Sequence, residues 1–263
     1  MAGPVSDSVI VFLHIPKTAG QTVHSELARA VGAKAVSPVR VHTQAETGAA
    51  QFPPGYRLYS GHLDWDALET IPAPRFTFTV LRDPLERIAS FYFFMRRQAE
   101  ACPPEELAKP GRSGMRMAIE HGPDGYFFGS TPKWRHFVKD HYHSTYCSYL
   151  VTRRMRGYAR IAELDHDTLV SRAQEAARGL DGVYSVDDLG RLEHDLGHRL
   201  GITANLTGRF VNSAPDDRGT SRWSQLDALI EQDETRHKLR EFAHADQLLM
   251  HRLGLGPEPQ PPS

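Results

Sequence analysis

The stretch that decides the fold is VIVFLHIPKTAGQTVHSELARAVG, at residues 9–32. It opens with a continuous apolar run that contains β-branched side chains, which is typical of a strand buried on both faces. From about Gln21, apolar side chains recur at helical spacing until Gly32 stops the pattern. The stretch therefore predicts a strand at residues 9–13, a tight loop at 14–20 and a helix that follows it directly.

Beyond this unit, short apolar runs alternate with amphipathic stretches. That alternation favours an α/β fold with a mainly parallel sheet and a largely helical C-terminal half. Residues 98–132 are rich in proline and glycine and are expected to be irregular. The further strands are expected at residues 57–60, 76–81 and 182–185, and the helices at 84–97, 133–155, 165–178, 187–200 and 224–253.

The length and composition are those of one globular domain. The chain has 263 residues, of which 40% are hydrophobic and 24% are charged. A core of this size needs neither a metal nor a disulfide to be stable. We expect a single domain at residues 1–253 and a disordered, proline-rich tail at 254–263.

The overall charge argues against a general attraction to nucleic acid or to an anionic membrane. The 31 basic and 32 acidic side chains nearly cancel, so anion binding must come from local basic sites. No apolar run approaches the roughly 18 residues of a membrane-spanning helix, and residues 1–13 do not resemble a signal sequence. The two cysteines, Cys102 and Cys147, are expected to be reduced. These features predict a cytoplasmic protein.

The loop between the first strand and the first helix has the composition of an anion-binding site. Successive backbone N–H groups there point at one spot, and the helix N-terminus adds partial positive charge. Ala19 and Gly20 would let a phosphate approach the backbone, while Thr18 and Thr22 carry hydroxyl donors. Lys17 adds a mobile positive charge. The Gly-x4-Gly-Lys-Ser/Thr order of a Walker A loop is absent, and an ordinary turn with a solvated lysine is the alternative.

A second candidate site follows the strand expected at residues 76–81. Arg82 leaves this strand, and Ser90 lies about two turns into the next helix. A guanidinium fork and a hydroxyl together suit a second phosphate group. The alternative is a surface network in which Arg82 pairs with Asp83, or Arg87 pairs with Glu86.

Two motifs together resemble those of the sulfotransferases that use 3′-phosphoadenosine 5′-phosphosulfate (PAPS): HIPKTAG at residues 14–20, and LRDP at 81–84 followed by Ser90. The resemblance is greatest to the carbohydrate branch, which includes heparan sulfate 2-O- and 6-O-sulfotransferases. It implies a P-loop-like, three-layer fold around a central parallel sheet, and it assigns the 3′-phosphate of PAPS to Arg82 and Ser90. The residues that it assigns to the 5′-phosphosulfate are Lys17, Thr18, Ala19, Gly20, Gln21 and Thr22, where Gln21 replaces the usual Thr or Ser.

Two later segments resemble the same family more loosely. At residues 182–185, GVYS stands where the family usually has Gly-x-x-Glu, so that Ser185 replaces the acid. Residues 211–213, VNS, resemble the late Asn-x-Ser/Thr loop of the family. By that resemblance, Arg218 would reach the 3′-phosphate end of the nucleotide.

His62 is the candidate general base. A neutral imidazole can take the proton of an acceptor hydroxyl as that oxygen attacks sulfur. The segment SGHLDW at residues 60–65 resembles the region of the catalytic histidine in the family, which implies that His62 and Trp65 contact the acceptor. The alternative is a histidine that only packs beside Trp65.

No metal site is predicted. His136, His141 and His143 lie close together, but their spacing matches no strong ligand pattern. Aromatic and basic side chains alternate across residues 133–146, where they fit either an acceptor groove or a helix face with solvated charges.

The reaction implied by the resemblance is an in-line sulfuryl transfer from PAPS to a hydroxyl of a small molecule, lipid or glycan, with 3′-phosphoadenosine 5′-phosphate as the leaving group. Lys17 would stabilise negative charge on the leaving phosphate, and His62 would deprotonate the acceptor. Two alternatives stay open. One is a nucleotide-dependent kinase, and the other is a module that binds the nucleotide or a sulfated glycan without turnover.

Overall fold

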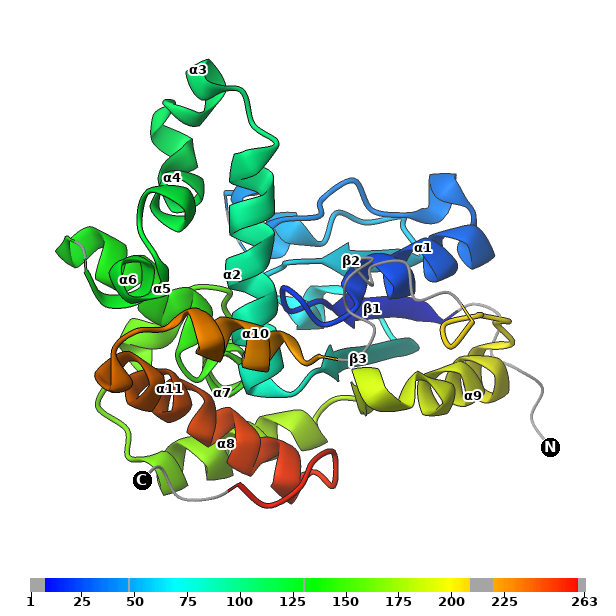
Figure 1. Ribbon diagram of the computed structural model, residues 1–263. Coiled ribbons are helices and arrows are strands. Elements are labelled where there is room, and N and C mark those ends of the chain that lie inside the picture. Colours follow the sequence, from blue (N-terminus) through cyan, green and yellow to red (C-terminus); the bar gives the residue numbers. More distant parts are fainter. Residues whose placement is uncertain (1–7, 47, 130, 209–219, 260–263) are drawn as a thin grey trace.

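A computed structural model describes residues 8–46, 48–129, 131–208 and 220–259. Its central feature is a sheet of four parallel strands in the order β2-β1-β3-β4 (Figure 1). All four strands expected from the sequence are present, each within one residue of the expected bounds. They are β1 (Val9–Leu13), β2 (Leu58–Gly61), β3 (Arg75–Leu81) and β4 (Gly182–Ser185).

The parallel pairing brings the carboxyl ends of the strands to one edge of the sheet. Leu13, at the end of β1, is in register with Gly61 at the end of β2. Leu81, at the end of β3, is in register with Ser185 at the end of β4. Residues that directly follow these strands therefore meet at this edge, where open α/β sheets bind their ligands.

Helices cover both faces of the sheet, which confirms the three-layer α/β arrangement. One face is covered by α1 (Gly20–Val31) and α9 (Leu189–Leu200). The opposite face is covered by α7 (Thr145–Thr152), α8 (His166–Arg178) and α11 (Asp233–Arg252). Alternate strand residues point into the two layers, so β1 is buried on both sides, as its continuous apolar run predicts.

A third core lies beside the sheet and is formed mainly by helices. Its central element is α2 (Pro84–Glu100), which stands between the sheet and α4 to α6 in Figure 1. The other helices that contribute to this core, besides α11, are α4 (Ser113–Glu120), α5 (Pro123–Phe128), α6 (Pro132–Tyr142) and α10 (Arg222–Leu229).

The expectation of irregular structure at residues 98–132 is wrong. This segment contains α3 (Pro104–Leu107), α4 and α5. Pro104 and Pro123 begin helices rather than break them, because the first turn of a helix does not use the missing N–H. The helices are only one or two turns long, which is too short for helical periodicity to be visible in the sequence.

The helices expected at 133–155 and 224–253 are each interrupted. The first divides into α6 and α7 at Ser144, whose φ of 45° is left-handed and whose N–H donates to the carbonyl of Phe242. The second divides into α10 and α11 at a break whose backbone N–H groups donate to the carboxylate of Asp124. Both breaks depend on partners far away in the sequence, so a local pattern cannot reveal them.

Two predictions fall on residues that the structure does not describe. Arg218 and the VNS segment at 211–213 lie outside the described residues, as does the end of the tail from residue 260. Within the described part of the tail, Leu255 packs against the core beneath α11. Across the described residues, no helix combines the length and the apolar character needed to span a membrane.

Candidate active site

The loop after β1 is held in shape by its own side chains. Lys17 and Ala19 have positive φ values of 73° and 59°, so the backbone turns sharply before α1 begins at Gly20. The buried hydroxyl of Thr18 donates to the carbonyl of Ile15 at 2.9 Å. The Thr18 hydrogen is therefore used inside the loop.

Gly20 has no room for a side chain, because the His14 ring lies against its α-carbon. A Cβ atom at this position would lie 1.7 Å from Nε2 of His14, so the His14 ring fills the space where a side chain would stand. The sequence predicts a glycine here so that a phosphate can approach the backbone, and the contact with His14 is a second reason for it. Of the neighbouring candidates, Thr22 is buried in α1 and Gln21 is exposed.

Lys17 lies within a group of positive charges. Its ammonium is 4.2 Å from the centroid of the Phe94 ring on α2. Burial, and after it the charges of Arg97, Arg222 and Arg82, together lower the pKa of Lys17 to about 8. We call these four basic residues the cation cluster. Cations held together in a partly buried place favour an anionic ligand, because each charge otherwise opposes the others.

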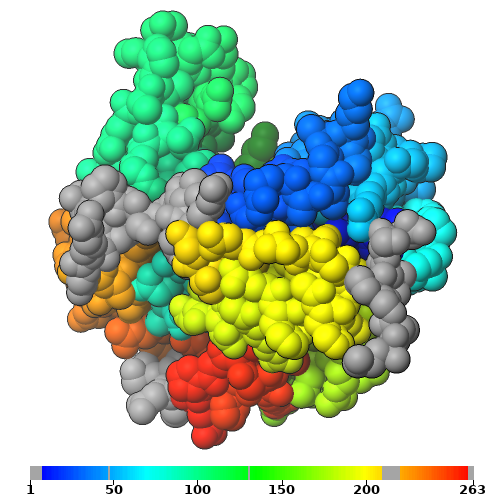
Figure 2. Space-filling model, turned by 90° about the vertical axis from the view of Figure 1, so that its right-hand side faces the viewer, coloured from blue at the N-terminus to red at the C-terminus, as the bar shows by residue number. Residues whose placement is uncertain are grey.

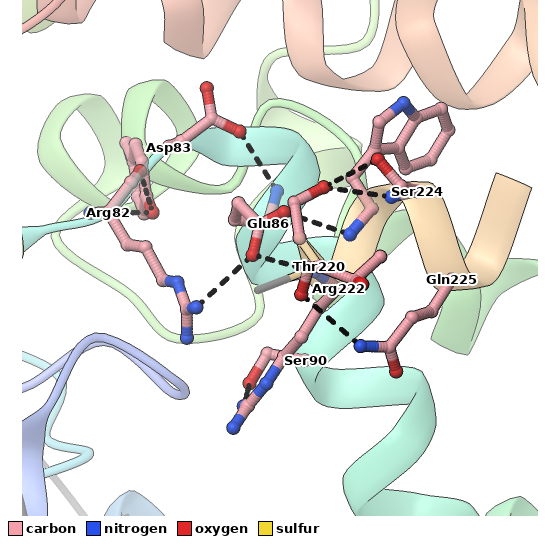
Figure 3. Close-up of polar contacts among 11 residues, drawn as sticks. Arg82, Asp83, Glu86, Ser90, Thr220, Arg222, Ser224 and Gln225 are labelled. Atoms are coloured by element: carbon pink, nitrogen blue, oxygen red, sulfur yellow. Dashed lines mark hydrogen bonds and ion pairs between the residues drawn. The ribbon is translucent and has the colours of Figure 1, made fainter. Parts of the chain in front are cut away.

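Ser90 and Arg222 form the centre of the second candidate site. Ser90 is fully buried on α2, and its hydroxyl oxygen accepts a hydrogen bond from Nη1 of Arg222 at 2.7 Å. Figure 3 shows the guanidinium groups of Arg82 and Arg222 extending toward the same side, with Ser90 beside Arg222. The sequence predicts a late arginine here, Arg218, which lies outside the described residues and stays a prediction. Within the described part of the chain, the arginine that contacts Ser90 is Arg222, four positions further on.

Arg82 forms an ion pair within its own segment, as the alternative interpretation predicts, but its partner is Glu86 and not Asp83. Its guanidinium donates to Glu86 at 3.2 Å, one turn along α2. Glu86 also accepts the backbone N–H groups of Arg222 and Trp223, at 3.2 and 2.9 Å. Asp83 instead caps α2 by accepting the N–H of Glu86 at 2.9 Å. The carboxylate of Glu86 thus orients Arg82 and joins the start of α10 to the same site.

His62 directly follows β2 and has a defined tautomer. Its Nδ1 lies 2.8 Å from the carbonyl oxygen of His14. Because a carbonyl can only accept, Nδ1 carries the proton, and Nε2 of the neutral ring has a free lone pair. Burial lowers the pKa of His62, the bond to the His14 carbonyl opposes that shift, and the charges of Arg40, His42 and Lys17 add to it. The ring is therefore neutral at pH 7 and can accept a proton.

A basic segment that the sequence analysis missed runs beside His62. The N–H of His62 donates to the carbonyl of Arg40 at 2.8 Å, and Val41 forms a parallel bridge with His62. Nη1 of Arg40 lies 2.6 Å from Nε2 of His24, whose other ring nitrogen is 3.1 Å from the hydroxyl of Ser60. These contacts join residues 16 to 36 positions apart, so a local sequence pattern does not reveal them.

Trp65 is buried in the core. Its indole N–H donates to the carbonyl of Tyr149 at 3.2 Å, and the guanidinium of Arg153 lies 4.7 Å above its ring. The ring borders a cavity of about 390 Å³ together with Arg75 and Asp181, which stand at the amino-terminal ends of β3 and β4. A contact between Trp65 and an acceptor stays a prediction.

Among the described residues, no three histidine, cysteine, aspartate or glutamate side chains are grouped to hold a metal ion. His141 is instead packed between aromatic rings, with its Nδ1 donating to the carbonyl of Phe137 at 3.1 Å. His143 packs against Tyr158 and Phe242.

The structure is that of an α/β protein with a basic loop at the carboxyl ends of a parallel sheet. A sequence model of the sulfotransferase family matches residues 5–153. The match spans more than half of the chain and includes the loop, His62, Arg82 and Ser90, while Arg222 lies beyond it. The chain belongs to the sulfotransferase family, whose members transfer sulfuryl groups. No curated protein matches the chain.

Proposed function

We propose that the protein transfers the sulfuryl group of PAPS to an acceptor hydroxyl, with His62 as the general base. The observation that carries this proposal is the position of a neutral histidine with a free Nε2 lone pair beside a basic loop. Membership of the sulfotransferase family supports the class of reaction.

The residues at the sheet edge fit a ligand with phosphate groups at two ends. The loop amides of residues 17–22 and the ammonium of Lys17 would hold the 5′-phosphosulfate. The guanidinium groups of Arg82 and Arg222, with the hydroxyl of Ser90, would hold the 3′-phosphate. Such a ligand offsets the mutual repulsion within the cation cluster. When bound, PAPS would supply an activated sulfuryl group.

Each protein group then has a distinct task. Lys17 would neutralise negative charge on the phosphate side of the bond that breaks. His62 would take the proton from the acceptor oxygen at Nε2, while the His14 carbonyl holds the Nδ1 proton in place. Positioning and fixed charge account for the rate, since no covalent bond to the protein is required.

The acceptor in this proposal is a hydroxyl of a small molecule or glycan. Figure 2 shows a recess between the arm formed by α3 and α4 and the surface of α1. Because α1 begins at the loop that carries Lys17, we propose that the acceptor enters through this recess.

Turnover with PAPS tests the proposal. Purified protein should convert PAPS to 3′-phosphoadenosine 5′-phosphate in the presence of some members of a panel of glycan, phenol and lipid acceptors. Calorimetry should show that 3′-phosphoadenosine 5′-phosphate binds without Mg²⁺. Tight, Mg²⁺-dependent binding of ATP would instead identify a kinase. Tight nucleotide binding without transfer to any acceptor would identify a binding module.

A further inference from the structure

We propose that His14 is a positioning residue that fixes the ring of His62 relative to the loop; this inference rests on the proposed role of His62 as the base. His14 makes three contacts that support this role. Its carbonyl accepts the Nδ1 proton of His62 at 2.8 Å, and the two imidazole rings lie 4.3 Å apart between centroids. Its Nε2 side stands against the α-carbon of Gly20.

The His14 ring belongs to a column of rings that rises from the core. Phe78 on β3 stacks on Phe12 of β1 at 4.9 Å, with an angle of 9° between the rings. Phe12 stacks on His14 at 5.3 Å and 21°, and His14 contacts His62. Phe12 and Phe78 are fully buried and close-packed, so the lower end of the column is held in the core of the sheet. The His62 ring therefore packs on a ring that itself rests on this core.

His14 does not compete for the proton that His62 is proposed to accept. Only 9% of the residue is exposed, and burial lowers its pKa well below the usual value. The ring is therefore neutral throughout the working pH range, and its contribution is its shape. The charged and titratable groups that face His62 are Arg40, His42, Lys17 and His14 itself.

The contact with Gly20 couples this column to the nucleotide loop. Gly20 is the first residue of α1, where the backbone N–H groups face the proposed phosphosulfate site. Since the His14 ring touches Gly20 on one side and His62 on another, it sets the distance between the base and the helix N-terminus. A base that is displaced by about 1 Å loses roughly 100-fold in rate.

Three single variants test this role: His14→Ala, His14→Phe and His62→Ala. His14→Ala should lower kcat roughly 100-fold, while the Kd for 3′-phosphoadenosine 5′-phosphate stays near that of the wild type. His14→Phe keeps a flat ring and should restore most of the turnover. The acid limb of the kcat/KM profile should move toward higher pH in His14→Ala, because His62 becomes more hydrated. His143→Ala, which removes a buried imidazole packed on Tyr158 and Phe242, is the matched control for stability and should leave kcat unchanged.

A double-mutant cycle with Gly20→Ala tests the coupling. The added methyl group collides with the His14 ring, so Gly20→Ala alone should lower kcat. In the His14→Ala background the ring is gone, so the two losses should not multiply. If His14→Ala does not fold, the single variant Gly20→Ala carries the test, because it must then lose turnover while it keeps its melting temperature.

The outcomes separate the two proposals. If His62→Ala keeps normal turnover, the proposed base is wrong, whatever His14 does. If His62→Ala is inactive but His14→Ala or Gly20→Ala turns over normally, or the cycle is additive, the positioning role is wrong. If His14→Phe is as inactive as His14→Ala, the imidazole nitrogens of His14 are needed and the role of a neutral spacer is overturned.

Discussion

Arg222 and Ser90 lie 132 positions apart in the chain, yet the guanidinium of one donates to the hydroxyl of the other at 2.7 Å. Both are buried, with Ser90 fully enclosed and Arg222 8% exposed. This contact joins α10 to α2, and Glu86 strengthens it by accepting the N–H of Arg222. The C-terminal part of the chain, which the family match does not reach, therefore contributes Arg222 to the second candidate site.

The first prediction concerns the choice of nucleotide. If Arg222 and Ser90 hold the 3′-phosphate, Arg222→Met should weaken binding of 3′-phosphoadenosine 5′-phosphate by roughly 10- to 150-fold, the value of about 1.5–3 kcal/mol for a lost charged contact. Arg222→Met should bind AMP, which has no 3′-phosphate, almost as tightly as the wild type does. Isothermal titration calorimetry with both nucleotides measures the difference.

Arg199→Met serves as the control for that experiment. Arg199 lies on α9, where it packs over Phe76 and lies near Asp181, so its loss should leave both affinities unchanged. An equal fall in the affinities of AMP and 3′-phosphoadenosine 5′-phosphate in Arg222→Met would contradict the 3′-phosphate assignment.

The second prediction concerns proton uptake by Lys17. Without an anion nearby, burial and the neighbouring arginines lower the pKa of Lys17 to about 8. A bound phosphosulfate favours the charged form and raises that pKa, so binding should take up a substantial fraction of a proton at pH about 8.5. Calorimetry in buffers of different ionisation enthalpy measures this uptake.

Two variants of Lys17 sharpen the test. Lys17→Arg keeps the charge but cannot titrate in this range, so it should abolish the uptake. Lys17→Ala should also lower kcat about 100-fold, by analogy with the loss of one donor to a developing anion. Undiminished uptake in Lys17→Arg would assign the proton to another group.

The four strands and the loop after β1 could be predicted from the sequence, because local composition determines them. Residues 9–13 are buried on both faces, and only apolar residues satisfy that position. The short helices at 98–132 could not be predicted from the sequence, because α4 and α5 each bury only a few residues and α3 buries none. The break between α6 and α7 at Ser144 could not be predicted either, because the Ser144 N–H donates to the carbonyl of Phe242, almost 100 positions away.

The candidate site was predictable where its residues follow strands, and it was not predictable elsewhere. Lys17, His62 and Arg82 lie at one sheet edge because parallel strands end there, which the sequence pattern already implies. Arg222 reaches the same region from the first turn of α10. Arg40 reaches it from the irregular segment that pairs with His62. Their positions follow from tertiary packing, and a single arginine in such segments carries no local signature.

The third prediction concerns His62. His62→Ala and His62→Asn should each lower kcat by roughly 100- to 10,000-fold, because neither side chain can accept the proton. Nucleotide affinity should stay close to that of the wild type. Since burial lowers the pKa of His62, the wild-type kcat/KM should begin to fall only below the ordinary histidine value of about 6.5. A wild-type acid limb well above that value would contradict the neutral, buried base.

The last prediction concerns stability and Asp246. This carboxyl group on α11 is buried, and it accepts the backbone N–H groups of Tyr146 and Cys147 at the start of α7. Burial raises its pKa to about 6, although those two hydrogen bonds and the charge of Arg87 oppose the shift. The folded state therefore binds this proton more tightly than the unfolded chain, whose aspartate has the ordinary value of 3.8.

The sign of the pH dependence follows from that difference. The stabilising contribution of the Asp246 proton is fully present below about pH 4 and is lost as the pH rises through about 6. Asp246→Asn cannot ionise, and its amide oxygen can still accept both N–H groups. The wild type should thus lose stability relative to Asp246→Asn between pH about 4 and 6, by up to about 3 kcal/mol. Urea unfolding of both proteins across this range measures the difference, and a difference that stays constant with pH would show that Asp246 keeps its ordinary pKa when buried.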